Sequence, residues 1–481
     1  MPESRPPMIK REPPKLLLWL TLLLGLAVFF WGLGAIPLLT FNEARRAIPT
    51  QAMFAGGDWL LPQLNGELYI AKPPLLYWLT TAASHVLGQV NEWSVRLPSA
   101  LAALIAVFAV YRYALRRFGA WAALFTAQVL IANTTFAMFA RRAEIEMLLT
   151  ALCLTALLAA LHYIQEQAGR RWLLLSYFLL GLAVLAKGPL ALIFVTLPLI
   201  AYALAYRETR AWQALRDPVG WAILLLVGSA WFLAVSAQLG FDIWHATLQR
   251  DIVNKVGGSD AKPFYNYFLW ILADFFPASL LLFIAPFAVW KRWKPDRKII
   301  APLVAILVPL LIFTAFSNKH AKYLLPAYPL IALLFGKRLG ELMETARPAL
   351  RKTLIALGLL MPFGYASFYA FAEARVFDYR HTALPSFAQW ADSIRATPLY
   401  AYERLDERAI YYANHAIPLL DKTELEKTRA TTPGFLLLIE SKKSDAPTPQ
   451  ADCEIRAFKP WLDRRATLTV LGFGTACAAI R

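Results

Sequence analysis

The chain is poor in charged residues and in cysteine. Asp, Glu, Lys and Arg make up 17% of its 481 residues, whereas roughly 25% is usual in soluble domains, so an ordinary soluble protein is excluded. Three cysteines are too few for disulfides to hold together a chain of this length, and no Cys and His cluster has zinc-ligand spacing. No glycine-rich nucleotide-binding loop follows a strand pattern, which disfavours a soluble nucleotide-sugar donor.

Apolar residues fill the sequence instead, at 58%, in runs long enough to cross a bilayer. The first run, 16–39, follows a Pro-rich basic segment. It is too long for a signal-peptide core and no small-residue cleavage site follows, so it predicts a transmembrane helix with a cytoplasmic N-terminus. Ten further spans bring the expected number of crossings to eleven, at 93–115, 119–139, 146–165, 171–186, 188–206, 218–237, 267–290, 299–316, 323–336 and 353–371.

Basic residues lie in every second loop between these spans, and this pattern sets the expected topology. With a cytoplasmic start, every inside loop is basic, as the positive-inside rule requires. The apolar stretch 72–88 is short and opens with two prolines, and a full crossing there would move the basic loops outside. We therefore expect it to be interfacial or re-entrant within a long periplasmic loop, about 40–92. The inside loops contain Arg112, Arg116 and Arg117, then Arg170 and Arg171, Arg207 and Arg210, residues 291–298, and Lys337, Arg338, Arg351 and Lys352.

The last part of the chain changes in composition. We expect 1–371 to be the transmembrane domain and 372–481 a soluble domain of the α/β or α+β class, placed outside by the odd number of crossings. Residues 434–441 and 468–480 are predicted as strands. Because this domain would lie in an oxidising compartment, we expect Cys453 and Cys477 to form a disulfide.

Polar residues cluster at the membrane ends on the outer side, where the positive-inside rule expects few basic residues. Taken singly, most have simpler interpretations: an interfacial anchor pair at Arg45 and Arg46, a snorkelling Lys72, and a helical salt bridge between Asp251 and Lys255. A carboxylate at the mouth of an apolar helix is costly unless paired, which favours function for one of Glu144 and Glu146. Lys187 lies between two apolar runs with no acidic neighbour in sequence, which favours function for it as well. Lys319 and Tyr323 have the i, i+4 spacing that predicts one helical face. The outer set also includes Asn42, Glu43, Arg141, Arg142, Glu144, Glu146, Lys187, Lys262 and Lys322.

Several cations with two or three carboxylates suit a lipid-linked phosphate. Ammonium and guanidinium groups neutralise a phosphate, while a carboxylate deprotonates an attacking hydroxyl. The outer-leaflet cluster therefore predicts transfer chemistry at a lipid carrier.

At these positions the chain resembles the polyprenyl-phosphate-dependent glycosyltransferases of family 39 and their bacterial aminoarabinose-transferring relatives. The motifs follow in family order over about 40–335: FNEARRAIPTQAMFAGGDWLLPQLNGELYIAKPPLLYW, ARRAEIEMLLT, LAKGP, DIWHATLQRDIVNKV with KPFYNYF, and FSNKHAKYLLPAYP. The resemblance implies a GT-C fold, an α-helical polytopic membrane protein with eleven to thirteen transmembrane helices and a C-terminal soluble periplasmic α/β domain. It implies catalytic roles at Glu43 and Glu146, and substrate binding by Arg45, Arg46, Lys72, Lys187, Asp251, Lys255, Lys319 and Tyr323.

The chain departs from the family pattern at two positions. The favoured catalytic aspartate is Asn42 here, and the residue before Lys72, acidic in the aminoarabinose transferase, is Ala71. An amide cannot accept a proton as a base. Either Glu43 or Glu146 takes that role, or the acceptor needs less help, or activity is lost.

The predicted function is inverting transfer of a sugar from undecaprenyl phosphate to a lipid A, glycolipid or protein acceptor at the periplasmic face of a bacterial inner membrane. Glu43 or Glu146 acts as the base or holds a divalent cation, and the expected partners are the carrier lipid, the acceptor and membrane lipids, with no nucleic acid. Two alternatives remain open: an inactive relative that binds carrier lipid, which Asn42 allows, and a lipid-linked-sugar flippase, which the one-sided cluster disfavours.

Overall fold

The structure, a computed structural model, describes residues 12–245, 262–284, 297–441 and 449–479. The chain forms two compact units. Unit 1 comprises Met1–Trp31, Ala71–Leu76 and Pro98–Phe368, and unit 2 comprises Gly32–Ile70, Tyr77–Leu97 and Tyr369–Arg481. The predicted boundary at 371 and 372 remains a prediction.

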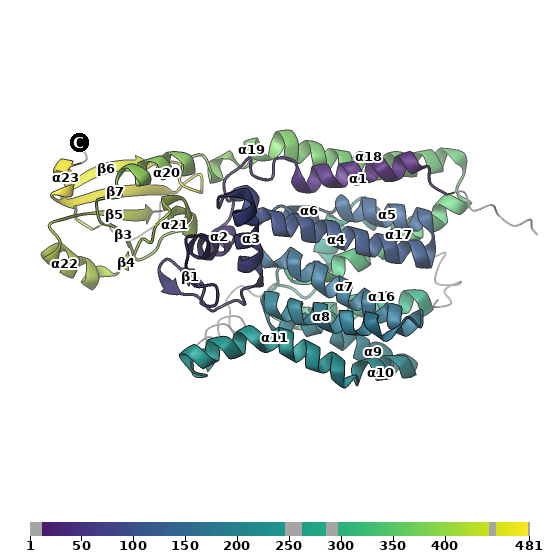
Figure 1. Cartoon of the computed structure of the whole chain (residues 1–481). Helices are drawn as coiled ribbons and strands as arrows, with labels where there is room; N and C mark the ends of the chain where they lie inside the picture. Colours follow the sequence, from purple (N-terminus) through teal and green to yellow (C-terminus); the bar gives the residue numbers. More distant parts are fainter. Residues whose placement is uncertain (1–11, 246–261, 285–296, 442–448, 480–481) are drawn as a thin grey trace, which may run out of the picture. The chain divides into compact units, whose positions relative to one another are not determined.

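Unit 1 is helical, and most of its helices fall within the predicted spans (Figure 1). Its elements in chain order are α1 (Lys15–Phe30), α5 (Ala120–Ile131), α6 (Thr134–Ala140), α7 (Ile145–Gln165), α8 (Arg170–Lys187), η1 (Pro189–Ile193), α9 (Thr196–Tyr206), α10 (Thr209–Leu215), α11 (Pro218–Leu239), α13 (Asn266–Asp274), η2 (Ala278–Leu280), α14 (Leu281–Ile284), α16 (Arg297–Ala315), η3 (Ala321–Ala327), α17 (Tyr328–Thr345) and α18 (Pro348–Ser367). Three elements contribute residues to both units: α3 (Leu75–Leu87), α4 (Glu92–Phe118) and the π-helix η4 (Phe368–Ala372).

Six helices in the described residues are long and apolar enough to cross a membrane, and α5 with α6, bent by 69°, makes a seventh if the pair is one span. The other predicted spans fall on the 16-residue α1, on α8 with charges at both ends, and on η3 with α17. The span predicted at 267–290 falls on the broken series α13, η2 and α14 up to Ile284, and 285–290 lie outside the described residues. The expected stretch at 72–88 is the 13-residue helix α3, too short for a span. Eleven crossings and the interfacial position of α3 remain predictions.

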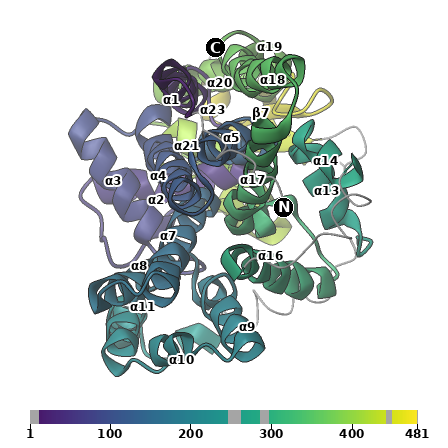
Figure 2. The same ribbon diagram turned by 90° about the vertical axis from the view of Figure 1, so that its right-hand side faces the viewer.

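Close helix packing in unit 1 depends on small residues. Gly336 and Gly340 of α17 face Thr126 and Ala122 of α5, where a Cβ atom would lie 2.1 Å from the Thr126 Oγ1 and 2.8 Å from the Ala122 N. Only glycine permits this approach, as is common between membrane helices. Figures 1 and 2 also show α1 running beside α18.

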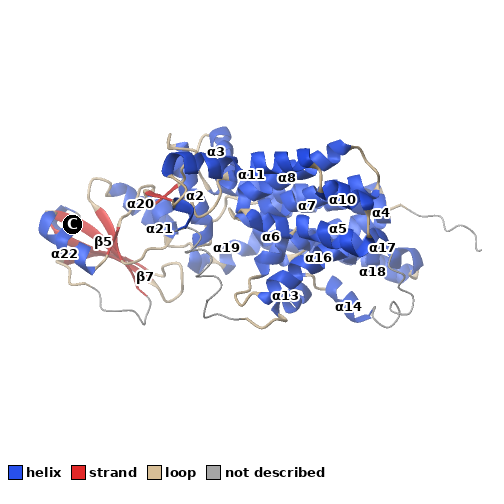
Figure 3. Cartoon of the chain, turned by 90° about the horizontal axis from the view of Figure 1, so that it is seen from below, coloured by secondary structure: helices blue, strands red, loops and turns tan. Residues whose placement is uncertain are grey.

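Unit 2 contains the strands, drawn red in Figure 3. Its five-stranded sheet has the order β4-β3-β5-β7-β6, with parallel pairs on the β3 side and antiparallel pairs on the β7 side of β5. Its elements are α2 (Phe41–Phe54), β1 (Gln63–Leu64), β2 (Glu67–Leu68), α19 (Glu373–Val376), α20 (Leu384–Ser393), β3 (Leu399–Tyr402), α21 (Glu407–Ala413), β4 (Leu419–Leu420), α22 (Lys422–Thr431), β5 (Gly434–Ser441), β6 (Cys453–Phe458), β7 (Thr467–Gly474) and α23 (Ala476–Ala479).

Side chains alternate between the two faces of β5, and its continuous apolar run therefore gives this sheet two buried faces. Leu436 and Leu438 pack into a core with α20 and α21, while Phe435, Leu437 and Ile439 face a second core. The strand predicted at 434–441 is confirmed. The segment predicted as strand at 468–480 is only partly so, since β7 ends at Gly474 and a helical turn follows. The predicted disulfide between Cys453 and Cys477 is confirmed.

Candidate active site

A helical hairpin in unit 1 brings Glu146 and Lys187 together. Helices α7 and α8 pack against each other and are joined by a short connection, so the first turn of α7 lies beside the last turn of α8. A carboxylate in a first turn and an ammonium in a last turn both suit the helix dipole. The Lys187 Nζ lies 3.0 Å from the Glu146 Oε1, so the lysine that has no acidic neighbour in sequence is paired in space.

The 3₁₀ helix η3 adds Lys322 and Tyr323 to this pair. The Lys322 Nζ lies 3.3 Å from the Glu144 Oε2 and 3.5 Å from the Glu146 Oε1. Burial lowers the pKa of Lys322, but the two carboxylates outweigh it and leave the pKa raised, so this amine is charged at neutral pH. The Lys187 Nζ lies 6.0 Å from the centroid of the Tyr323 ring. We call Glu144, Glu146, Lys187, Lys322 and Tyr323 the paired cluster.

Two more lysines and a histidine lie next to η3. Lys319 is buried, and its Nζ donates to the carbonyls of Lys262 and Phe316 at 3.1 and 2.5 Å. Burial, with Lys262 and Lys322 nearby, lowers the pKa of His320, so its ring is neutral at pH 7. The prediction that Lys319 and Tyr323 share a helical face is wrong, because η3 begins at Ala321 and Lys319 turns back toward the preceding segment.

Unit 2 contains a second buried carboxylate, Glu43, in the first turn of α2. The Arg96 Nε donates to the Glu43 Oε1 at 2.9 Å, and the Leu39 amide donates to its Oε2 at 2.8 Å. The two Nη atoms of Arg96 donate to three backbone carbonyls between residues 33 and 37, at 2.8 to 3.0 Å. Both side chains are almost wholly buried, at 0% and 3% exposure. Glu43 thus fixes the chain between α1 and α2, and we call it with Arg96 the buried clamp.

The arginines that follow Glu43 have protein partners. Arg45 pairs with Glu407 of α21 at 2.5 Å and is 39% exposed. Arg46 is buried, and its Nη1 donates to the hydroxyl of Tyr77 at 2.7 Å. Burial raises the pKa of Tyr77 to about 12, against the lowering effect of Arg46.

The remaining predicted residues are placed less specifically. Asn42 is half-buried in the first turn of α2. Lys72 belongs to unit 1 and is half-buried, with its Nζ 2.9 Å from the Ala71 carbonyl. Asp251 and Lys255 lie outside the described residues. Within the described part of the chain, no three His, Cys, Asp or Glu side chains gather as a metal site.

Sequence reasoning missed two residues as members of a site. Lys322 stood in the outer set without a role, although it directly precedes the family tyrosine. Arg96 is a charged residue inside the predicted span 93–115, and such a residue needs a partner. That rule was the available signal for Arg96.

Comparison with known proteins matches both halves of the chain. Residues 71–237 match the dolichyl-phosphate-mannose-protein mannosyltransferase family and residues 260–398 the Alg9-like mannosyltransferase family. The undecaprenyl phosphate-alpha-4-amino-4-deoxy-L-arabinose arabinosyl transferases of Pseudomonas aeruginosa and Pectobacterium carotovorum are 31% and 28% identical, over 71% and 69% of this chain. The chain spans 64% and 60% of the length of these curated relatives.

Solved structures agree in fold over nearly the whole chain. ArnT from Cupriavidus metallidurans bound to undecaprenyl phosphate superposes with a TM-score of 0.78 at 19% identity, covering 95% of this chain and 98% of that one. The Archaeoglobus fulgidus oligosaccharyltransferase has a TM-score of 0.57 at 10% identity, covering 89% and 69%. These likenesses show the fold of the chain.

Proposed function

Since the chain is a GT-C-fold relative of the polyprenyl-phosphate-dependent glycosyltransferases, similar in sequence to the aminoarabinose transferases, we propose that it is an inverting glycosyltransferase. It moves a sugar from a polyprenyl-phosphate carrier, undecaprenyl phosphate in bacteria, to a lipid A, glycolipid or protein acceptor. The observation that carries this proposal is the paired cluster, where two lysines share two buried carboxylates beside a tyrosine.

The cluster suits a phosphate leaving group. In the transfer, the acceptor oxygen forms a bond to the anomeric carbon as the bond from that carbon to the phosphate oxygen breaks. The leaving phosphate takes the electron pair. Lys187 and Lys322 stabilise the developing charge, and the Tyr323 hydroxyl donates to it.

Glu146 is the better base of the two predicted carboxylates. Both oxygens of Glu43 already accept hydrogen bonds, from an arginine and from a backbone amide, so neither is available to take the proton of an acceptor hydroxyl. The partners of Glu146 are lysines, whose flexible amines turn toward a phosphate when it binds. Glu146 then takes the acceptor proton, while Glu43 is a positioning residue and Asn42 has no role as a base.

The other predicted residues are proposed as contacts to the donor or acceptor. Lys72 directly follows Ala71, where the family acid is missing, and its ammonium group suits a phosphate. Lys72→Ala is expected to reduce transfer by orders of magnitude with little loss of folded protein, and near-normal activity would return it to the snorkelling interpretation. The remaining proposed contacts are Arg45, Arg46, Asp251, Lys255 and Lys319.

The protein is a multi-pass membrane protein, and we propose a cytoplasmic N-terminus and a periplasmic C-terminal domain in the inner membrane. The disulfide in that domain agrees with an oxidising compartment. Reporter fusions after residue 295 and at the C-terminus are expected to lie on opposite sides, and agreement between them would contradict this topology.

The proposed activity is tested with purified full-length protein, radiolabelled polyprenyl-phosphate sugar and lipid A or glycolipid acceptors. Transfer to acceptor that is lost in Glu146→Gln supports the enzyme. Donor binding without turnover, unchanged by Glu146→Gln, supports the inactive relative. Movement of lipid-linked sugar across vesicle membranes without transfer supports the flippase.

A further inference from the structure

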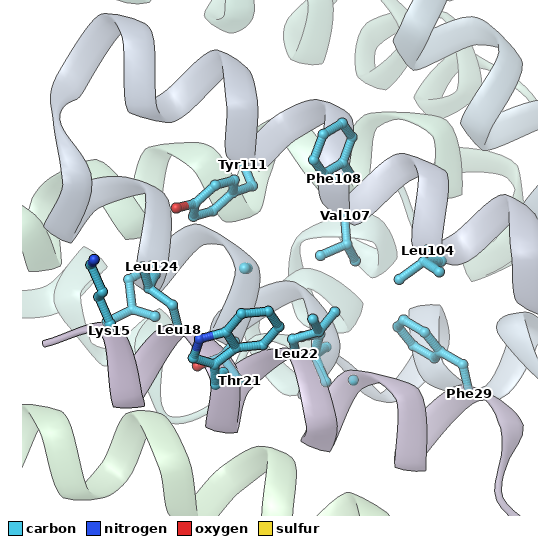
Figure 4. Close-up of a pocket in the computed structure, with 14 residues that line it drawn as sticks. Lys15, Leu18, Thr21, Leu22, Phe29, Leu104, Val107, Phe108, Tyr111 and Leu124 are labelled. Carbon is cyan, nitrogen blue, oxygen red and sulfur yellow. The ribbon is translucent and has the colours of Figure 1, made fainter. Parts of the chain in front are cut away.

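An apolar groove in unit 1 lies between α1, α4 and α5, apart from the paired cluster (Figure 4). Its volume is about 440 Å³, within the range of small-ligand sites. The residues of α1 that line the groove lie along one face of this helix, from Lys15 to Phe29. The lining includes Leu18, Leu22 and Phe29 of α1, Leu104 and Phe108 of α4, and Leu124 of α5.

Local packing brings α1 against α5 along the groove and leaves its walls apolar. Gly25 of α1 faces Ile131 of α5, where a Cβ atom would lie 3.0 Å from the Ile131 Cδ1, so α1 approaches α5 closely there. The one hydroxyl on the α1 wall, Thr21, donates to the Leu17 carbonyl and accepts from Gln128. Its hydrogen-bonding capacity is therefore used within the protein.

One end of the groove is polar. Figure 4 shows the Lys15 amine and the Tyr111 hydroxyl at this end and Phe29 at the other. Within the part of the chain that the structure describes, Lys15 forms no ion pair. It is the first residue of α1, and the preceding Pro14 supplies no side-chain cap, so the positive end of the helix dipole adds to the charge. Trp19, 63% exposed, has the amphipathic ring typical of the membrane interface.

The apolar walls of the groove disfavour both water and an empty space as its occupant. Water needs two or more polar partners, which the apolar walls do not offer. An empty groove in a bilayer forfeits dispersion contacts along its whole lining. A hydrocarbon chain fills it, and the amine at its mouth selects a lipid with a negative headgroup.

We propose that this groove binds one acyl chain of an anionic glycerophospholipid, with the headgroup phosphate on Lys15 and Tyr111. By the predicted topology Lys15 lies at the cytoplasmic face, as do Arg112, Arg116 and Arg117 at the end of α4, and this leaflet is where basic residues attract anionic lipids. The site is thus on the leaflet opposite to the proposed transfer reaction and does not depend on it.

Native mass spectrometry of the full-length, delipidated protein with phosphatidylglycerol, phosphatidylcholine or polyprenyl phosphate tests the proposal. The parent is expected to retain phosphatidylglycerol preferentially. Lys15→Ala lowers that retention about fivefold, the effect of one interfacial lysine, while Lys15→Arg keeps it. Leu104→Trp fills the groove and lowers retention of both lipids.

Matched controls lie elsewhere on the membrane helices. Leu226→Trp on α11 changes a leucine that is 74% exposed, and Lys352→Ala removes an exposed lysine on α18. Neither is expected to alter retention. Equal retention of both lipids by the parent, or unchanged retention in Lys15→Ala, overturns the proposal. So does retention of polyprenyl phosphate in place of phosphatidylglycerol that Leu104→Trp abolishes, since the occupant is then the carrier tail.

Discussion

Replacing Glu43 and Glu146 by Gln separates a structural carboxylate from a catalytic one. In Glu43→Gln the buried Arg96 loses its anionic partner, and the new amide nitrogen is forced toward either the Arg96 Nε or the Leu39 amide, both of which are donors. Breaking a buried ion pair typically costs about 3–5 kcal/mol. Because Arg96 keeps three carbonyl acceptors, we expect the lower end, about 3 kcal/mol of lost stability.

Glu146→Gln is expected to behave in the opposite way. Lys322 keeps Glu144 as a partner, and Lys187 still donates to the new amide oxygen although it loses the charge of Glu146. The loss of stability is therefore expected to be smaller than in Glu43→Gln, whereas the loss of a general base lowers kcat about 10²–10⁴-fold. The assay measures unfolding in detergent by a thermal or denaturant scan and turnover per folded molecule. Glu407→Gln is the matched control, because its pair with Arg45 is partly exposed and worth at most about 1 kcal/mol.

The result that refutes this reasoning is a Glu43→Gln protein as stable as the parent but without turnover. That outcome makes Glu43 the base and the buried clamp part of the chemistry. Normal turnover in Glu146→Gln equally removes Glu146 from the base role.

Four further outcomes are expected. Lys187→Ala reduces transfer by orders of magnitude with little loss of folded protein, because it removes a phosphate contact and not a packed core residue; near-normal transfer counts against the paired cluster. Cys453→Ser destabilises the C-terminal domain by about 2–4 kcal/mol in denaturant unfolding under oxidising conditions, and equal stability of parent and variant contradicts this. Burial, with Asp406 nearby, raises the folded-state pKa of Glu440, so ionising this carboxyl group above the ordinary pKa of Glu costs stability. Glu440→Gln is therefore expected to be more stable than the parent at pH 7. Denaturant scans below pH 4 should show no such gain, because the parent carboxyl group is then neutral in both states. Asn42→Asp creates activity only if the parent is the inactive relative, which a transfer assay decides.

Much of this protein follows from local sequence. Most predicted spans fall on helices, and the strand at 434–441 is in place, because continuous apolar runs specify these elements without long-range contacts. The disulfide follows from the side of the membrane assigned to two cysteines. Charge in an apolar setting marked Glu146 and Lys187 as residues that need partners.

Only the tertiary structure decided which charges meet. Glu146 and Lys187 lie 41 positions apart, and Lys322 comes from a third element 178 positions from Glu144. Glu43 and Glu146 are alike as sequence signals, yet one is held by a rigid arginine and a backbone amide and the other by two flexible lysines. The affinity of a carboxylate for a proton depends on such partners and on burial, and packing brings these together across distances that no local pattern records.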